Sequence, residues 1–297
     1  MKNDKGETPR QLIDWAAEKF DKAGLYYGHG TDNSYDEAAF LILRGLGLAF
    51  DVSEEILDQA LQKEQRDRIT TLVNQRITTR KPAAYLLGEA WFAGMPFFVN
   101  EDVLVPRSPI AELITERFSP WCLSENVHSI LDIGTGSGCI AIACAVAFPE
   151  ARVDAVDISD ATLKVAARNV EHYELQDRVS LIKSDLFHGL AGKKYDLVIA
   201  NPPYVDDEDM ATLPDEYRHE PALGLYAGKD GLDIVNRILA SAAQYMTEQG
   251  ILVVEVGNSQ YALTENYPDV PFIWLEFEKG GEGIFMLSRE ELLHWFC

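Results

Sequence analysis

The sequence predicts an α/β protein whose mostly parallel sheet has one antiparallel terminal strand and follows a small helical N-terminal domain. Three observations predict this fold. Apolar residues repeat at helical spacing through residues 1–85, and strand-like apolar runs alternate with helical segments from about residue 128 onward. The last two strand-like runs are joined by only four residues, a link too short for a parallel crossover.

The N-terminal segment carries signals for three helices. Thr8 precedes Pro9, a pair typical of a helix start, and Gly24 is placed to end that helix. Apolar positions at spacings of three and four predict a second helix over 34–46 and a third, longer one from 53 to about 80. Residues 1–85 are therefore expected to form a helical bundle.

A hairpin and a linker over residues 86–108 are expected to follow the bundle. The run 91–99 contains Gly94 at a turn and reads as two short strands. The third domain, 109–297, contains the alternating pattern. Its expected strands are 128–133, 152–158, 179–184, 195–200, 250–256, 271–278 and 283–287.

The charge is acidic and unevenly distributed. Of the net −22, residues 1–100 contribute −3 and residues 101–297 contribute −19. A protein that binds nucleic acid directly needs a basic surface to displace counterions, so this distribution argues against that class and permits a strongly basic protein partner.

Composition also bears on location. The chain starts without an apolar leader, and its longest apolar run, 139–148, is too short to span a bilayer. The four cysteines show no C-x-x-C pair, so we expect reduced thiols, no bound metal and a cytoplasmic protein with no membrane attachment. The sequence carries no signal for an oligomeric state.

The most informative motif is Asn201-Pro202-Pro203-Tyr204, which follows the apolar run 195–200. Two prolines cannot continue a sheet ladder, so the strand ends at Asn201 and a stiff extended segment follows. The Asn201 side-chain carbonyl and the Pro202 carbonyl together can accept both hydrogens of a planar –NH2 group, on which Tyr204 can stack. A proline-rich turn is the alternative explanation.

A glycine-rich loop joins the first strand of the alternating region to its helix. It comprises Asp132, Ile133, Gly134, Thr135, Gly136, Ser137 and Gly138. Glycines at this place let a ligand approach the backbone at the positive end of a helix. A dinucleotide fingerprint would need glycine or alanine where Cys139 stands, so we expect a different ligand, whose α-ammonium group Asp132 would receive.

Two further acidic residues end the next two strands. Asp157 is placed to accept the hydroxyls of a ribose, and Asp185 to meet an adenine amino group, with Leu186 and Phe187 as apolar cover. The alternative is that both acids are helix caps or turn residues. Taken with the glycine loop, they indicate a ligand with an amino-acid end, a ribose and an adenine, the three parts of S-adenosylmethionine.

These motifs resemble the class I, S-adenosylmethionine-dependent methyltransferases, in the branch that uses Asn-Pro-Pro-Tyr to methylate amino groups. Within it the chain resembles the glutamine methyltransferases, which share its helical N-terminal domain, here the expected substrate-recognition domain. Two groups of that family modify release factors or large-subunit ribosomal protein three. The stretches 105–109, 220–221 and 228–232 resemble the glutamine methyltransferases as a whole. The stretches that resemble the ribosomal-protein group are 26–32, 214–221, 255–259 and 267–277.

The resemblance implies the roles of the site residues. Asn201 and Pro202 would hold the amide nitrogen of a glutamine in line with the donor methyl, while Pro203 and Tyr204 wall the slot. Arg107 would help to close the cofactor site. The implied partner is a basic ribosomal protein of the large subunit.

Three alternatives stay open at this stage. The release-factor group shares the catalytic motifs. An adenine methyltransferase can use the same tetrapeptide on a flipped base, but it needs a basic groove. A scaffold without catalytic activity that binds cofactor and ribosomal protein is the third, and the intact motif at Asn201 speaks against it.

Overall fold

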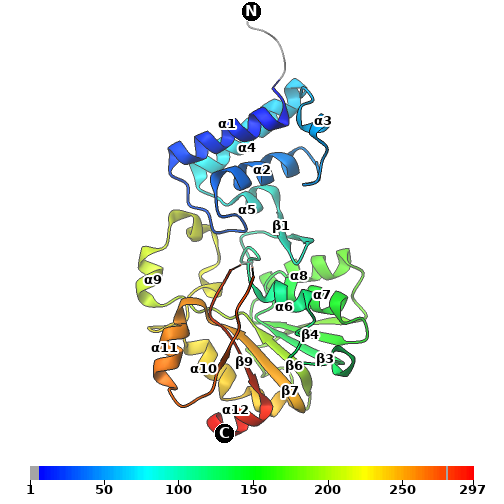
Figure 1. Cartoon of the computed structure of the whole chain (residues 1–297), viewed down its shortest axis with the longest axis vertical. Helices are drawn as coiled ribbons and strands as arrows, with labels where there is room; N and C mark the ends of the chain where they lie inside the picture. The colour runs from blue at the N-terminus through cyan, green and yellow to red at the C-terminus, as the bar shows by residue number, and fades with distance from the viewer. Residues whose placement is uncertain (1–6, 279) are drawn as a thin grey trace, which may run out of the picture. The chain divides into compact units, whose positions relative to one another are not determined.

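A computed structural model describes residues 7–278 and 280–297, which fold into two units (Figure 1). The helical unit contains the chain up to Ala90 together with Pro214–His219, and the sheet unit contains Trp91–Leu213 and Glu220–Cys297. The sequence-based division at residues 85 and 108 therefore differs from that of the structure, because a short segment far along the chain joins the helical unit. Residues 1–6, which bear on the expected lack of a leader, lie outside the described part.

The helical unit is built from capped helices around an apolar core. The Thr8 side chain accepts a hydrogen bond from the Gln11 backbone N–H, and Gly24 ends the first helix at φ +58°. The predicted start and end of this helix are confirmed. The helices of the unit are α1 (Pro9–Ala23), α2 (Ser34–Gly45), α3 (Glu54–Leu57), α4 (Lys63–Thr79) and α5 (Ala83–Leu87), with the 3-10 helix η2 (Asp215–His219).

The single long helix expected over 53–80 is wrong, because the structure breaks it into α3 and α4. The first piece ends at Asp58. The second begins after Gln62, whose backbone N–H donates to the Gln65 side chain in a reciprocal cap. Apolar spacing alone did not reveal this new start, because the cap consists of two glutamines rather than the usual Ser, Thr, Asp or Asn.

A buried ion cluster lies inside the helical unit. Arg76 is 1% exposed, and its Nε donates to Glu37 at 2.6 Å. Its Nη1 lies 3.5 Å from Glu216 in η2, and its Nη2 donates to the Tyr26 carbonyl at 3.0 Å. Arg80 also donates to Glu216, at 3.2 Å. Charges hidden from water in this way are tolerated only when paired, so the cluster fixes the segment 214–219 to this unit.

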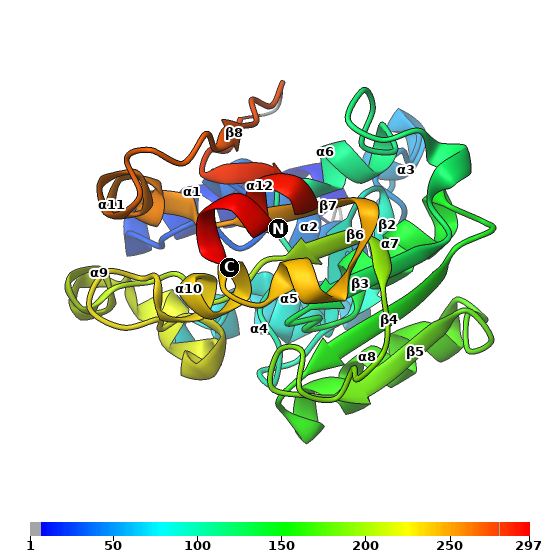
Figure 2. The same ribbon diagram turned by 90° about the horizontal axis from the view of Figure 1, so that it is seen from below.

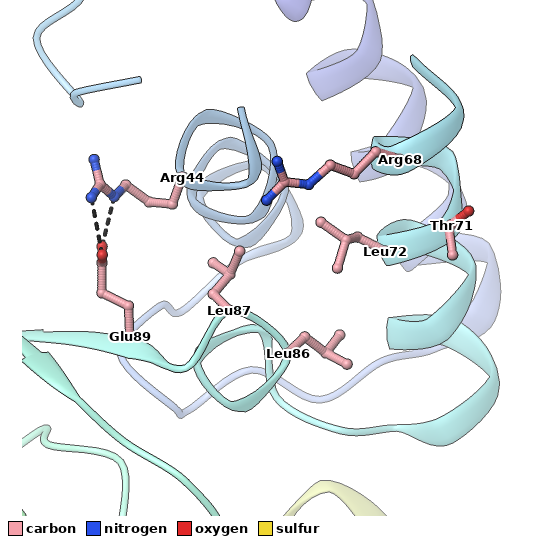
Figure 3. A pocket seen from close by; sticks show the side chains of 7 residues that line it. All are labelled: Arg44, Arg68, Thr71, Leu72, Leu86, Leu87 and Glu89. Carbon is pink, nitrogen blue, oxygen red and sulfur yellow. Dashed lines mark hydrogen bonds and ion pairs between the residues drawn. The ribbon is translucent and has the colours of Figure 1, made fainter. Parts of the chain in front are cut away.

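The helical unit also contains a hollow of about 300 Å³ (Figure 3). Three leucines line it together with the ion pair between Arg44 and Glu89, whose Nε–Oε1 distance is 2.6 Å. Arg68 lies on the other side. None of the residues predicted for chemistry lines this hollow, whose lining is Arg44, Arg68, Thr71, Leu72, Leu86, Leu87 and Glu89.

The sheet unit is organised around a seven-stranded sheet of order β5-β4-β3-β6-β7-β9-β8 (Figure 2). β9 is antiparallel to both of its neighbours, and the other contacts are parallel. The predicted fold class is thereby confirmed. The strands are β3 (Ser129–Ile133), β4 (Arg152–Asp157), β5 (Val179–Lys183), β6 (Tyr195–Ala200), β7 (Met246–Glu255), β8 (Ile273–Trp274) and β9 (Ile284–Ser288), and the separate hairpin is β1 (Glu89–Phe92) with β2 (Met95–Phe98).

The last strands of the sheet have different bounds in the structure from those predicted. The run 271–278 forms only the two-residue strand β8, which has a single neighbour because it lies at the edge of the sheet. Its link to β9 includes Lys279, which is outside the described residues. β7 begins four residues earlier than expected, at Met246.

Helices cover both faces of the sheet, and the strands alternate between two cores. Ile130, Leu197 and Val253 pack with α6, α7 and α8, whereas Leu131, Val198 and Leu252 pack with α10, α11 and α12. No helix within 7–278 and 280–297 is long and apolar enough to cross a bilayer. The helices are α6 (Ile110–Thr115), α7 (Cys139–Ala147), α8 (Asp160–His172), α9 (Asp207–Thr212), α10 (Asp233–Leu239), α11 (Gln260–Asn266) and α12 (Arg289–Phe296).

We expect the buried ion cluster to contribute strongly to the stability of the helical unit. Arg76→Ala leaves Glu37 buried without its cation and leaves Glu216 with Arg80 alone, and we expect a loss of roughly 3–5 kcal/mol in the stability of the helical unit. The control is Arg10→Ala, which removes ion pairs to Glu54 and Asp58 that are largely exposed and should change the unfolding midpoint much less. Urea unfolding followed by circular dichroism measures both. Equal midpoints for the two variants would contradict the prediction.

Candidate active site

Strand register brings the predicted site residues to one edge of the sheet. Ile133 at the end of β3 is level with Val156 in β4 and with Ala200 in β6. Asp157 in turn is level with Lys183 in β5. The segments that follow β5, β4, β3 and β6 therefore leave the sheet side by side, at the carboxyl edge where open α/β sheets bind ligands.

The glycine loop after β3 requires its glycines. Gly134, Gly136 and Gly138 have φ of +72°, +57° and +81°, which side-chain-bearing residues rarely adopt. The backbone N–H groups of Gly134 and Thr135 both donate to the Val156 carbonyl at 2.9 Å, which ties the loop to β4. A Cβ on Gly138 would lie 3.3 Å from the Ala166 Cβ, so this glycine also allows α7 to pack close to α8.

Asp132 is buried beneath this loop. Its Oδ2 accepts from Thr135 Oγ1 at 2.6 Å and from the Ala141 N–H at 3.2 Å, so one oxygen holds the loop and the start of α7. Its Oδ1 is buried and has no hydrogen-bond partner within 7–278 and 280–297. Burial raises the pKa of Asp132 to about 7. The contact with an α-ammonium group stays a prediction, and Oδ1 is the atom left for it.

Asn169 on α8 fixes the other side of the loop. Its Nδ2 donates to the Ser137 carbonyl at 2.8 Å and to the Phe98 carbonyl at 3.0 Å. Its Oδ1 accepts from the Phe98 N–H at 2.8 Å. Ser137 is thus held by its backbone, and its side chain is 2% exposed. Sequence reasoning missed Asn169, because an asparagine inside a helix carries no signal of a distant contact.

Asp157 faces the glycine loop from the end of β4. Its Oδ2 accepts from the Gly136 N–H at 3.2 Å, and its Oδ1 accepts from the Ser159 N–H at 2.9 Å. Burial raises the pKa of Asp157, while these backbone donors lower it. Ser159 itself caps α8, so the cap role considered for Asp157 belongs to its neighbour.

Asp185 follows β5, where its carboxylate is already paired. Arg237 Nη2 on α10 lies 2.8 and 2.7 Å from the two Asp185 oxygens. Leu186 is half-buried beside it, with φ of +51°. Phe187 points elsewhere: it is 4% exposed and stacks on Tyr245 at 4.7 Å, so of the expected apolar pair only Leu186 stays at the sheet edge.

The tetrapeptide after β6 combines an open asparagine side chain with a tyrosine whose polar groups are hydrogen-bonded. The Asn201 side chain is half-buried and makes no hydrogen bond to the residues that the structure describes. A Cβ on Gly134 would lie 3.9 Å from the Asn201 backbone carbonyl, so the tetrapeptide borders the glycine loop. Pro202 is buried, Pro203 half-buried, and the Tyr204 carbonyl accepts from Ser259 Oγ at 2.9 Å.

A buried carboxylate at the end of β7 lies next to Tyr204. Glu255 is 5% exposed, and its Oε1 accepts from the Tyr204 hydroxyl at 3.2 Å. Its Oε2 accepts a short hydrogen bond from Ser108. Burial raises the pKa of Glu255, although both donors and the Arg107 charge lower it. In the sequence, Glu255 and Ser108 served only as parts of stretches that resemble the family. Their contact was not predicted, because 147 positions separate them.

Arg107 is held within the sheet unit and is not a solvated side chain. Its Nη1 and Nη2 donate to the two oxygens of Glu220 at 2.6 and 2.8 Å, and the Val105 N–H donates to Glu220 Oε1 at 2.9 Å. The Glu220 side chain is fully buried. This fork of hydrogen bonds fastens the segment 105–108 beside the tetrapeptide. A direct role of Arg107 at the cofactor stays a prediction.

Comparison with known proteins gives concordant results. The family model "Methyltransferase small domain" matches residues 116–214. Two curated proteins named ribosomal protein uL3 glutamine methyltransferase match nearly the whole chain. That of Francisella tularensis subsp. tularensis is 49% identical over 97% of this chain and 92% of its own, and that of Bordetella pertussis is 47% identical over 96% of each.

A solved structure supports the fold alone. The catalytic domain of hMettl16, in complex with MAT2A 3'UTR hairpin 6, has a TM-score of 0.50 at 18% identity, over 76% of this chain and 81% of that one. The resemblance stated from the motifs is confirmed by the two curated relatives, whose similarity spans both units. The chain belongs to the family of ribosomal protein uL3 glutamine methyltransferases.

Proposed function

We propose that the protein transfers a methyl group from S-adenosylmethionine to the side-chain amide nitrogen of a glutamine in ribosomal protein uL3. The observation that carries the proposal is the Asn201 side chain, which makes no hydrogen bond within the described residues and lies at the carboxyl end of β6, beside the glycine loop. The curated relatives carry the name of the same activity.

The residues along the sheet edge fit the methyl donor. Glycines with positive φ leave room for a ligand against the loop backbone, and the orphaned Oδ1 of Asp132 suits an ammonium group or an ordered water. Asp157 offers carboxylate oxygens to a ribose, and Leu186 offers an apolar surface to an adenine. At Asp185 an adenine amino group would share the carboxylate with Arg237. When bound, S-adenosylmethionine supplies a methyl group already activated on a sulfonium centre.

The tetrapeptide would make the substrate amide nitrogen a better nucleophile. An amide nitrogen is a poor nucleophile because its lone pair is delocalised into the carbonyl. Acceptance of both N–H hydrogens, by the Asn201 side chain and the Pro202 carbonyl, increases electron density on nitrogen and orients its lone pair. Tyr204 and Pro203 restrict the amide plane. A strong base is unnecessary, since the product proton can leave to water.

The proposal includes a basic protein partner and excludes direct binding of nucleic acid. Ribosomal proteins are basic, and residues 101–297 carry a net −19. The same charge disfavours an adenine in nucleic acid as the substrate, and the whole-length relatives favour uL3 over a release factor. We also propose a cytoplasmic location, supported by a substrate that belongs to the ribosome.

The experiment that tests the function uses purified protein, S-adenosylmethionine and purified uL3. Mass spectrometry of the product should show the mass of one added methylene unit on a glutamine-containing peptide. Release factor and adenine-containing oligonucleotides serve as competing substrates. Methylation of either in preference to uL3 would overturn the proposal.

The first functional prediction concerns the cofactor. Asp157→Ala should weaken S-adenosylmethionine binding by roughly 1.5–3 kcal/mol, the range for hydrogen bonds to a charged group. The matched control is Asp160→Ala, which removes an exposed carboxylate three residues further on that pairs with Lys183. Titration calorimetry measures both. Unchanged affinity in the Asp157 variant would remove this residue from the cofactor site.

The second prediction separates chemistry from binding. Asn201→Ala should reduce single-turnover methylation by roughly 10²-fold or more, because an orienting acceptor is lost, while cofactor affinity stays within about three-fold. Asn266→Ala, at an exposed asparagine of α11, is the control and should behave as wild type. Turnover near wild type in the Asn201 variant would refute the amide-holding mechanism.

The third prediction concerns the partner. Asp207, Glu208 and Asp209 follow the tetrapeptide in α9, and Asp206 caps that helix, so Asp206 is kept. Conversion of the other three to Asn, Gln and Asn should slow association with uL3 and flatten its salt dependence, because attraction between opposite charges is screened by salt.

A control variant removes equal charge from the opposite end of the strands, at Glu150, Glu171 and Asp177, which are exposed. Stopped-flow association rates over a salt series compare the two triple variants. The docking role of α9 fails if both variants change the rate equally.

A further inference from the structure

Tyr204 is held from several sides within the sheet unit. A Cβ on Gly257 would lie 2.7 Å from Tyr204 Cε2, so the ring rests directly on this glycine. A Cβ on Gly231 would lie 2.2 Å from the Tyr204 carbonyl oxygen, which also accepts from Ser259 Oγ. These close approaches fix the backbone and one face of the ring. The hydroxyl is a further point at which the ring is held, and it lies at the end of the ring away from the backbone.

The hydroxyl is bound by Glu255, which is itself held in place. Ser108 donates to Glu255 Oε2 and accepts from the Ile110 N–H at 3.1 Å, so the serine is fixed by the start of α6. The neighbouring Arg107 is fastened to Glu220. The Glu255 carboxylate is therefore held in place by β7 and by Ser108 of the segment 105–108. Its hydrogen bond to the hydroxyl orients the Tyr204 ring.

A charged group at this depth is unfavourable for stability. Glu255 is 5% exposed, and burial raises its pKa. The Arg107 charge lowers this pKa, but the Arg107 guanidinium itself is hydrogen-bonded to another carboxylate, Glu220. The hydroxyl groups of Ser108 and Tyr204 and the Arg107 charge oppose the effect of burial and favour the ionised carboxylate. Buried acids balanced in this way cluster at functional sites.

We propose that Glu255 is a positioning residue for methyl transfer, which acts through the Tyr204 hydroxyl and is itself oriented by Ser108. The proposal rests on the proposed function and assigns a role that the tetrapeptide alone does not contain. In the proposed transfer, positive charge would pass from the donor sulfur to the nitrogen held by Asn201 and Pro202, and the Tyr204 ring would lie beside that nitrogen. A ring whose hydroxyl donates to a carboxylate is held in place and is richer in electrons, so it stabilises that charge better.

The test is a double-mutant cycle between Glu255 and Tyr204, read as kcat and KM for uL3. Glu255→Gln keeps the shape and removes the charge, and Tyr204→Phe removes the hydroxyl. Each should lower kcat by about 10-fold or more, with KM and S-adenosylmethionine affinity within about two-fold. The double variant should be no slower than Tyr204→Phe alone, because Glu255 acts through the hydroxyl.

The control is Asp196→Asn, which alters another hydrogen-bonded carboxylate near the opposite end of the strands. Asp196 accepts from the His128 N–H at 3.0 Å and from Thr247 Oγ1 at 3.0 Å. This variant should change stability and leave kcat at the wild-type value. A loss of kcat equal to that of Glu255→Gln would show that the loss of any hydrogen-bonded carboxylate of the sheet lowers kcat, and would overturn the proposal.

A second readout does not depend on turnover. In protein with ¹³C-labelled tyrosine, the Tyr204 ring should flip faster in Glu255→Gln than in the wild type, as seen by NMR line shapes. If Glu255→Gln does not fold, Ser108→Ala replaces it in the same cycle and should give a smaller loss of kcat in the same direction.

Unchanged kcat, or losses that multiply in the double variant, would overturn the role of Glu255. Wild-type protein that fails to methylate uL3 would instead overturn the proposed function.

Discussion

The parallel register of β3 with β4 and β6 is the constraint on which the site depends. Because Ile133 is level with both Val156 and Ala200, the glycine loop, Asp157 and Asn201 leave the sheet at one level. The strands are apolar on both faces and are covered by helices, so a slip in register would bury the wrong side chains in both cores. The same packing that stabilises the sheet therefore sets the spacing between the glycine loop and the tetrapeptide.

This arrangement also places a row of carboxylates partly or fully out of contact with water, which is unfavourable for stability unless each one is hydrogen-bonded. Each is stabilised differently: Asp132 by a hydroxyl and a helix N–H, Asp157 by loop N–H groups, Asp185 by Arg237 and Glu255 by Ser108 and Tyr204. Burial raises the pKa of three of them, Asp132, Asp157 and Glu255. Their acidity is thus tuned by local donors, and a bound ligand that supplies further donors adds to the same balance.

Much of the fold and part of the site could be predicted because both are local in sequence. β6 matches its predicted bounds, since an apolar run is cut by two prolines, and Thr8 and Gly24 mark α1 as expected. The break between α3 and α4 was missed because glutamines form its cap. The Glu255–Ser108 and Arg107–Glu220 contacts join positions more than 100 residues apart, and the capture of 214–219 by the helical unit depends on an ion cluster. No local pattern encodes such pairings.

The hydrogen-bond acceptors proposed to hold the substrate nitrogen are uncharged, and this affects whether an amide or an ammonium group can bind. Asn201 and Pro202 offer uncharged carbonyls, and the nearby carboxylate of Glu255 is occupied by Ser108 and Tyr204. A lysine ammonium would have to lose its hydration shell to bind here, and neutral carbonyls would offset only part of that desolvation free energy. A planar amide carries no charge, and its two N–H groups match the two carbonyl acceptors. A carboxylate turned toward the slot would reverse this preference. Under the proposed mechanism the acidic surface would attract a basic protein and the Asn201 and Pro202 carbonyls would select its amide, because attraction acts at long range and selection occurs only after desolvation.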